Sequence, residues 1–290
     1  MATTYPKLVV IVGETASGKS DLAMHIAQQF GGEIICADSW TVYKGFDIGT
    51  AKPTLLDRKT VPHHLLDVAE PLHGFSAAEF KRKADIAIKD ISAKGKVPIL
   101  VGGTGLYVDS ILFDYGFLPA GSEKLRQELN KLSIEQLLAR IKQQAIDIAG
   151  IDIRNKRRLV RLLETGGQRP SKQKLRPNTL LIGLSVPADD LQNRVTGRVD
   201  AMLANGLENE VADLAHRYGW AVEPMKGIGY REFKDYFNGV QTISQTRERI
   251  IQATLQFAKK QRTWFKRNKS IHWQGNPRQA MELVTTFLNT

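Results

Sequence analysis

The stretch LVVIVGETASGKS, residues 8–20, decides the fold. Leu8 to Val12 form a short apolar run rich in β-branched residues, which is typical of a strand buried on both faces of a parallel sheet. Residues 13–20 match the pattern G-x-x-x-x-G-K-[ST], and apolar residues at helical spacing follow from Leu22 to Phe30. A strand, a glycine-rich loop and a helix in this order predict a phosphate-binding loop.

This loop has the chemistry of a diphosphate or polyphosphate site. Its glycines let successive backbone N–H groups point into one concavity, and the helix N-terminus adds partial positive charge. Lys19 supplies a cation, and the Ser20 hydroxyl can ligate Mg²⁺. We therefore predict phosphate contacts from the whole loop: Gly13, Glu14, Thr15, Ala16, Ser17, Gly18, Lys19 and Ser20. The motif does not identify the molecule that carries the phosphates.

Bulk composition excludes several classes of protein. The chain has 290 residues and a single cysteine, Cys36, so a disulfide framework and a cysteine-rich zinc site are excluded. The start MATTYPK lacks the layout of a signal peptide, and no apolar run approaches the length of a membrane span. We expect a cytoplasmic protein with no membrane partner, and we expect a monomer because no oligomerisation signal is visible.

Charge is unevenly distributed along the chain. Residues 1–112 hold twelve basic and twelve acidic side chains, so the whole net charge of +11 belongs to the later part. Such an asymmetry favours a polyanion that docks on the later part, with a solvated basic surface as the plainer alternative. The charge therefore indicates a nucleic-acid partner.

Two further apolar runs end in polar residues that suit a ligand site. The expected strand 33–37 is followed by Asp38, and the expected strand 97–101 is followed by Gly-Gly-Thr104. Ligands in open α/β sheets bind at the carboxyl ends of the strands. Asp38 could hold Mg²⁺, act as a general base or cap a turn. In nucleoside-triphosphate hydrolases, the strand that corresponds to 97–101 commonly ends in an Asp. Gly-Gly-Thr at this position weakens the interpretation that the chain hydrolyses a nucleoside triphosphate.

The remaining segments complete an α/β prediction: a P-loop NTPase-like parallel sheet flanked by helices, with an α-helical insertion. A fourth strand is expected at 179–186, and helices are expected at 76–94, 189–217 and 246–267. Residues 44–71, which include the pair His63-His64, are expected to be mostly loop around one short helix. We place the core domain at 1–113 and 178–290 and the insertion at 114–177, with helices at 122–132, 133–144 and 154–164. Arg154, Arg157, Arg158 and Arg161 fall at i, i+3, i+4 and i+7, which predicts a guanidinium stripe suited to RNA phosphates.

Collinear segments over nearly the whole chain resemble the tRNA dimethylallyltransferase (tRNA isopentenyltransferase) family. The segments are GETASGKS (13–20), DSWTVYKGFDIGTAKP (38–53), PHHLLDV (62–68), PILVGGTGLY (98–107), RRLVRLLE (157–164), RVDAML (198–203), GIGYREF (227–233) and AKKQRTWFKR (258–267). The sequence departs from the family pattern at Glu14, where Pro is common, and at Thr41, where Gln is frequent. No zinc finger follows the core, so the chain looks like the bacterial type.

The resemblance implies an activity and a set of site residues. Dimethylallyl diphosphate would bind in the phosphate loop with Mg²⁺ on Ser20, and its prenyl group would move to N6 of the adenosine just 3′ of the tRNA anticodon. Asp38 matches the family's base, Thr104 would orient the amine or the bridging oxygen, and Arg194 and Arg198 would stabilise the departing diphosphate. The target base would leave its stack. The residues implied to contact tRNA are Asp38, Ser39, Trp40, Thr41, Thr104, Arg126, Arg157, Arg158, Arg161, Lys226, Gly227, Gly229, Tyr230, Arg231, Lys259, Lys260, Gln261, Arg262, Thr263 and Lys266.

Three other interpretations share some of these features. A small-molecule kinase would use ATP in the same loop, but it should carry an Asp at the end of a core strand. An adenylate isopentenyltransferase would prenylate free AMP or ADP, which needs no extensive basic surface. A non-catalytic RNA-binding protein would not need Asp38 and Thr104 beside an intact phosphate loop.

Overall fold

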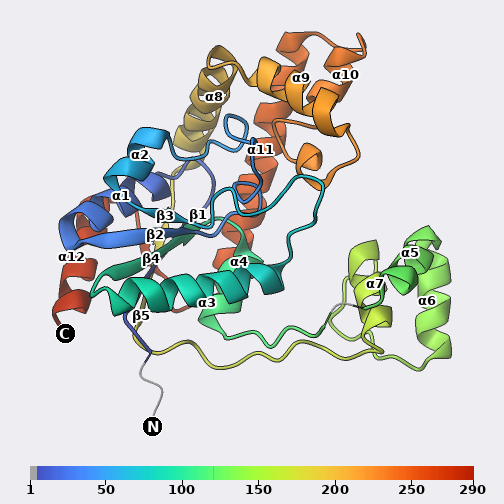
Figure 1. Cartoon of the computed structure of the whole chain (residues 1–290), viewed down its shortest axis with the longest axis horizontal. Coiled ribbons are helices and arrows are strands. Elements are labelled where there is room, and N and C mark those ends of the chain that lie inside the picture. The colour runs from blue at the N-terminus through green and yellow to red at the C-terminus, as the bar shows by residue number, and fades with distance from the viewer. Residues whose placement is uncertain (1–4, 120) are drawn as a thin grey trace. The chain divides into compact units, whose positions relative to one another are not determined.

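In a computed structural model of the protein, which describes residues 5–119 and 121–290, six strands form one parallel sheet in the order β3-β2-β4-β1-β5-β6 (Figure 1). The strands are β1 (Leu8–Gly13), β2 (Gly32–Cys36), β3 (His63–His64), β4 (Val97–Gly102), β5 (Thr179–Leu184) and β6 (His272–Gln274). The four strands expected from the sequence are confirmed. The two edge strands were not expected, because runs of two and three residues are too short to show a periodicity.

The order of the strands places the phosphate loop in the middle of the sheet. Val10 of β1 pairs with Leu100 of β4 on one side and with Leu181 of β5 on the other. All these strands run the same way, so the segments that follow β1, β2 and β4 emerge at one edge. The loop, Asp38 and Thr104 therefore come together although they are far apart in the sequence.

Both faces of the sheet are covered, as the apolar strand sequences predict. Val9 and Ile11 face a core shared with α1 (Lys19–Phe30) and α12 (Pro277–Asn289). The alternate residues Val10 and Val12 are also fully buried. Helices α3 (Ala77–Ala93) and α4 (Gly105–Leu112) contact β4, and α11 (Ile243–Phe265) contacts β1.

Further helices build a second core on the carboxyl side of the chain. They are α8 (Ala188–Ala204), α9 (Leu207–Tyr218), the 3₁₀ turn η1 (Glu223–Lys226) and α10 (Phe233–Phe237), while α2 (Leu55–Thr60) lies in the first half of the chain. The single helix expected at 189–217 is wrong. The helix is interrupted at Asn205–Gly206, so that two helices form. Gly206 has φ +93°, a backbone conformation that is strained for any residue with a Cβ.

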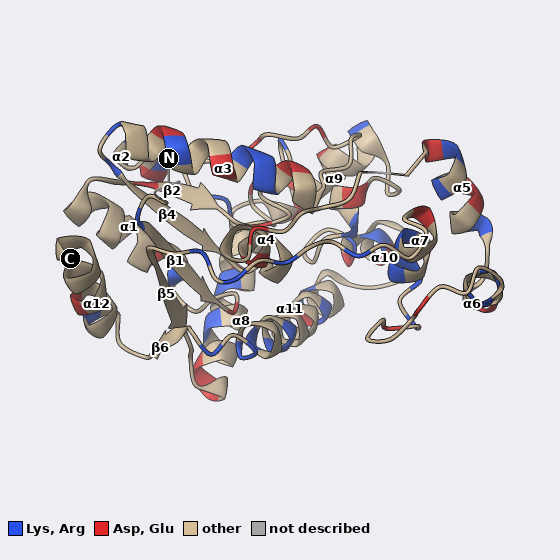
Figure 2. Ribbon diagram, turned by 90° about the horizontal axis from the view of Figure 1, so that it is seen from below, with Lys and Arg blue, Asp and Glu red and all other residues tan. Residues whose placement is uncertain are grey.

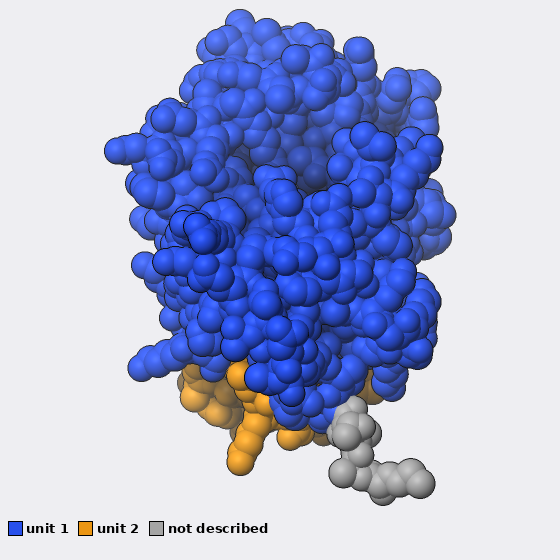
Figure 3. Space-filling view, turned by 90° about the vertical axis from the view of Figure 1, so that its left-hand side faces the viewer, with its two compact units in different colours: residues 1–112, 176–290 blue, residues 113–175 orange. Residues whose placement is uncertain are grey.

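The described chain divides into two compact units, coloured separately in Figure 3. Unit 1 comprises residues 1–112 and 176–290, and unit 2 comprises residues 113–175. Unit 2 contains α5 (Glu123–Lys131), α6 (Ile134–Gln143) and α7 (Lys156–Glu164), which share a small apolar core. Ser122, Ser133 and Asn155 cap these helices, so the first two begin where the sequence predicts and the third begins two residues later. Among the described residues, no helix is long and apolar enough to cross a bilayer.

Candidate active site

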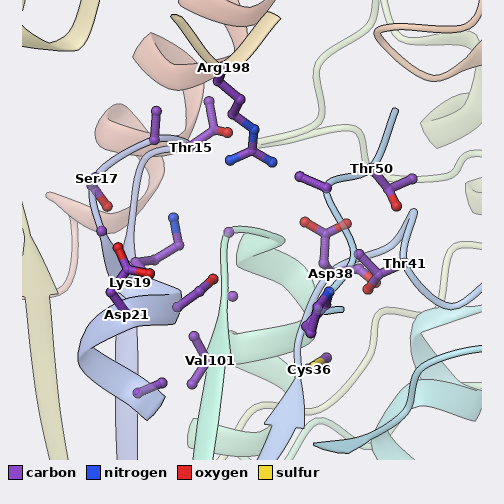
Figure 4. A pocket seen from close by; sticks show the side chains of 18 of the residues that line it. Thr15, Ser17, Lys19, Asp21, Cys36, Asp38, Thr41, Thr50, Val101 and Arg198 are labelled. Atoms are coloured by element: carbon purple, nitrogen blue, oxygen red, sulfur yellow. The ribbon is translucent and has the colours of Figure 1, made fainter. Parts of the chain in front are cut away.

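A cavity of about 590 Å³ opens in unit 1 at the carboxyl ends of β1, β2 and β4. The phosphate loop and the first turn of α1 form one side, and Asp38 and Thr41 form the other. Figure 4 shows the side chains of Lys19, Arg198 and Asp38 entering this cavity from three different elements. The sheet topology thus brings together the residues that the sequence selected for diphosphate and for general-base chemistry.

The backbone of the phosphate loop has the curled geometry that anion binding requires. Gly13 has φ +148°, and a Cβ at this position would lie 2.4 Å from the Leu184 carbonyl oxygen. Ala16 and Gly18 also have positive φ, at 60° and 89°. The Ser17 hydroxyl is buried and has no hydrogen-bond partner among the described residues. A buried hydroxyl in a phosphate loop is satisfied when a ligand oxygen enters the loop.

The Lys19 ammonium lies inside this loop and is poorly solvated. Its Nζ donates a hydrogen bond to the Glu14 carbonyl oxygen at 2.5 Å. Burial and the nearby Arg198 guanidinium together lower the pKa of Lys19 to about 8, and the Asp38 and Glu14 carboxylates oppose the shift. Lys19 and Arg198 are both positively charged and repel each other, so an anion that binds between them is favoured.

Helix α8 supplies the two arginines expected at the diphosphate. Arg194 and Arg198 are one turn apart, and both line the cavity. The Arg194 Nη1 atom lies 4.0 Å from the position that a Cβ on Gly18 would occupy. Burial lowers the pKa of Arg198 from its usual value, and Asp38 opposes that shift. The site therefore has positive charge on the loop and opposite it.

Asp38 and Thr104 lie at the ends of neighbouring strands and are linked through Ser39. The Asp38 Oδ1 atom accepts a hydrogen bond from the Trp40 N–H at 2.9 Å. The Thr104 Oγ1 atom accepts a hydrogen bond from the Ser39 N–H at 3.0 Å. Thr41 is buried, and its hydroxyl lies 3.4 Å from the Asp38 carbonyl oxygen. These contacts fix the segment after β2, so Thr104 orients the Asp38 segment, although Thr104 is not among the residues that line the cavity.

The donor atoms fit a magnesium ion that binds together with a diphosphate. Ser20 lines the cavity and is exposed, and the Asp38 carboxylate lies on the other side of the same cavity. No group of three or more His, Cys, Asp or Glu side chains that could hold a metal occurs within residues 5–119 and 121–290. Mg²⁺ commonly binds through one or two protein oxygens and substrate phosphates, so a site of this kind suits it.

Four predicted ligand contacts pair with other residues of the protein, although Gln261 and Tyr230 also line the cavities. Glu14 was predicted to contact diphosphate, but its carboxylate is fully buried and accepts hydrogen bonds from Arg262 at 2.9 and 2.5 Å. Arg262 was predicted to contact tRNA and is used in this pair. Gln261 is buried against the phosphate loop, and Tyr230 is buried with its hydroxyl on Glu210 at 2.8 Å. Residues that are far apart in the sequence make these pairs, so no local pattern could reveal them.

A second, smaller cavity adjoins the first. Its volume is about 80 Å³, and it shares Thr15, Asp38, Thr50, Arg198 and Phe257 with the larger cavity. Trp40 and Gly229, which the resemblance implies at the tRNA, line the smaller cavity. Thr50 and Phe257 were missed by the sequence analysis. Thr50 lies within the segment 38–53 that carries the resemblance, which is the one signal that could have found it.

The basic residues expected on the outside of unit 1 are exposed. Lys259, Lys260 and Thr263 lie on the solvent side of α11, whose basic positions are blue in Figure 2, and Lys266, which follows the helix, is also exposed. Lys226 and Arg231 are also exposed, and they pair with Glu223 at 2.9 Å and Glu232 at 2.8 Å. Gly227 comes close to the Trp40 ring, because a Cβ there would lie 3.2 Å from it. The glycine-rich turn thus permits a close backbone approach.

The four arginines of unit 2 that were predicted to contact tRNA divide into two groups. Arg157 and Arg158 are exposed on α7, whereas Arg126 and Arg161 pair with the buried Glu164 carboxylate. Arg126 binds both oxygens of Glu164, at 2.5 and 2.9 Å, and Arg161 also donates to the Leu118 and Pro119 carbonyls. Arg154 precedes the helix cap. The predicted four-arginine stripe is therefore wrong as a continuous helix face.

Comparison with known proteins identifies relatives over nearly the full length. A family model described as IPP transferase matches residues 41–268. A tRNA dimethylallyltransferase of Staphylococcus epidermidis is 38% identical over 308 aligned residues, covering 99% of this chain and 92% of the relative. A tRNA dimethylallyltransferase of Geobacillus thermodenitrificans is 42% identical, covering 92% of this chain and 90% of the relative.

Solved structures agree with these relatives. The full-length tRNA isopentenylpyrophosphate transferase of Bacillus halodurans superposes with a TM-score of 0.76 at 33% identity, covering 98% of this chain and 97% of that one. A eukaryotic dimethylallyltransferase acting on tRNA superposes with a TM-score of 0.77 at 29% identity, covering 89% of this chain and 69% of that one. The similarity extends across both the sheet and the helical insertion, because it covers almost every residue of the chain.

Proposed function

The chain belongs to the IPP transferase family and transfers a dimethylallyl group to tRNA, and we propose that the donor is dimethylallyl diphosphate and the acceptor is N6 of the adenosine just 3′ of the anticodon. The observation that carries the proposal is the cavity itself. Its diphosphate side has Lys19 and Arg198, and its opposite side has the Asp38 carboxylate. This pairing suits a reaction in which an anion leaves on one side and a proton leaves on the other.

The reaction balances with these residues. The bond from N6 to C1 of the donor forms while the bond from C1 to the bridging oxygen of the diphosphate breaks. The N6 proton passes to the Asp38 carboxylate. A base is needed because the lone pair of an exocyclic amine is delocalised into the ring, which makes the amine a poor nucleophile. Lys19, Arg194 and Arg198 stabilise the charge that develops on the diphosphate. When bound, Mg²⁺ neutralises part of that charge, and Ser20 would hold it.

Several features support a polynucleotide acceptor. Exposed basic residues on α11 and α7 offer phosphate contacts, and a free nucleotide would need far fewer. Asp38 lines both adjoining cavities, so a base that leaves its stack can approach it through the smaller one.

The test offers labelled donors and acceptors in pairs. The purified protein is incubated with Mg²⁺, either labelled dimethylallyl diphosphate or labelled ATP, and either unmodified tRNA or AMP. We expect label in tRNA from dimethylallyl diphosphate alone, and mass spectrometry of the digested tRNA should locate the added group on one adenosine beside the anticodon. Prenylated AMP as the main product, or transfer of phosphate from ATP, would overturn the proposal.

A further inference from the structure

We infer that Gln261 is a positioning residue whose side-chain amide sets the distance between the donor diphosphate and the acceptor base. This inference rests on the proposed function and assigns a task to a residue that the sequence placed at the tRNA. Gln261 lies near the end of α11 and lines the large cavity. Its side chain touches two segments that follow different strands of the sheet.

Both ends of the Gln261 amide are used. Its Oε1 atom accepts a hydrogen bond from the Thr15 N–H at 2.8 Å, and its Nε2 atom donates one to the Gly103 carbonyl oxygen at 3.0 Å. The residue is 5% exposed. A Cβ on Gly103 would lie 2.1 Å from Nε2. Any larger residue at position 103 would therefore collide with the Gln261 amide. A buried amide with its donor and acceptor both satisfied fixes its neighbours firmly.

The two segments joined by the amide serve different substrates. Thr15 belongs to the phosphate loop, two residues before the buried Ser17 hydroxyl. Gly103 precedes Thr104, whose hydroxyl oxygen accepts a hydrogen bond from the Ser39 N–H. This hydrogen bond fixes the segment that carries Asp38. The Gln261 amide therefore links the phosphate loop to the segment that carries Asp38 through Gly103, Thr104 and Ser39.

The end of α11 is held in place by independent contacts. Arg262 donates to the Glu14 carboxylate and to the Val186 carbonyl oxygen at 2.9 Å, and Glu14 also accepts from the Val186 N–H. Trp264 donates from Nε1 to Asp109 at 3.0 Å, and its ring fills the space beside Gly105. These contacts fix the helix turn from which Gln261 projects, so the amide has a rigid support.

Loss of the amide should affect turnover more than donor binding. The phosphate loop keeps Lys19, Ser17 and its backbone N–H groups, so the diphosphate still has its contacts. The reacting atoms lose their fixed separation, and a misplacement of about 1 Å can cost about 10²-fold in rate. A purely structural residue would instead lower the amount of folded protein and leave the turnover of the folded fraction unchanged.

The first experiment compares three variants in the tRNA prenylation assay with dimethylallyl diphosphate as donor. Gln261→Met keeps the length of the side chain and removes both hydrogen bonds. Gln256→Met makes the same change at an exposed position of α11, and Phe265→Leu reduces a fully buried ring in the same helix. We expect Gln261→Met to lower kcat about 10- to 100-fold, with the KM for the donor within about threefold. Gln256→Met should match the wild type, and Phe265→Leu should lower Tm without lowering kcat per folded molecule.

The second experiment uses Gln261→Glu and a pH series. A protonated carboxyl group has the shape of the amide, accepts from the Thr15 N–H and donates its O–H to the Gly103 carbonyl, whereas the carboxylate cannot donate. The ratio of the kcat of this variant to that of the wild type should rise as the pH falls from 8 to about 5.5. The same ratio for Gln261→Met should stay flat.

These outcomes separate the inference from the proposed function. If the wild type does not prenylate tRNA, the proposed function fails. If the wild type is active and Gln261→Met retains kcat within twofold, or loses no more than Phe265→Leu at equal loss of Tm, the inference alone is overturned. A flat pH ratio for Gln261→Glu would overturn it as well.

Discussion

The two units use pairs between a buried glutamate carboxylate and partly exposed arginines for different purposes. In unit 1, Glu14 and Arg262 join the phosphate loop to α11, so the pair shapes a ligand site. In unit 2, Glu164 joins Arg126 of α5 to Arg161 of α7, so the pair holds a small helical core together. The comparison teaches that an arginine in a basic segment can be structural, and that burial of its acidic partner distinguishes it from a phosphate contact.

The largest effect tests the assignment of chemistry to unit 1. Asp38→Asn should lower the rate of tRNA prenylation by about 10²- to 10⁴-fold, because the amide has the same size but cannot accept the N6 proton. Affinity for tRNA should stay unchanged, since its basic contacts lie elsewhere. Single-turnover rates and a tRNA titration on the same preparation measure both quantities. Near-normal turnover would remove Asp38 from the role of base.

The next effect tests whether the stability of unit 2 depends on the buried Glu164 carboxylate. Glu164→Ala should destabilise unit 2 by about 1–2 kcal/mol, because two partly exposed arginines lose the buried carboxylate that joins α5 to α7. Hydrogen exchange should accelerate across α5, α6 and α7 and stay unchanged in β1 and β4. Donor binding should persist. Uniform acceleration throughout the chain would show that the two units unfold together.

A smaller effect separates the arginines of α7 by function. Arg157→Gln combined with Arg158→Gln should lower tRNA affinity and make the plot of log affinity against log salt shallower by about two units. Arg161→Gln should destabilise unit 2 with little change in that slope, because its guanidinium binds Glu164 and two carbonyls. Equal slopes for the double variant and the wild type would remove α7 from the tRNA surface.

The smallest effect concerns the pKa of Lys19. The free enzyme should lose the Lys19 proton as the pH rises through about 8, because burial and Arg198 disfavour the charged form. Bound diphosphate favours that form, so donor affinity should be constant below this pH and fall above it by at most about tenfold per pH unit. Calorimetric titrations from pH 7 to 9.5 measure the decline. Lys19→Met should bind weakly and show no such decline; a parallel decline in both proteins would assign the proton to another group.

Much of unit 1 could be predicted because its signals are local. The β-branched run 8–12 and the spacing of the loop glycines each lie within one element, and the structure confirms the strand and the helix that follows the loop. The helix expected at 76–94 is confirmed at Ala77–Ala93. The break at Gly206 was missed, because a helical pattern on both sides conceals a single glycine. The edge strand His272–Gln274 was missed because it is defined by its pairing with β5 and not by its own sequence.

The sequence by itself determined the parallel α/β class, the phosphate loop, the helical insertion and the family, since these depend on periodicity, motif spacing and collinear segments. Lys19, Asp38, Arg194 and Arg198 were selected from the sequence, and they line the cavity. Tertiary structure alone decided which other predicted contacts pair within the protein. Glu14 and Arg262 are 248 positions apart, and Thr15 and Gln261 are 246 apart. Nothing in either local sequence signals such a contact, because the ends of different strands and one helix meet only when the sheet has formed.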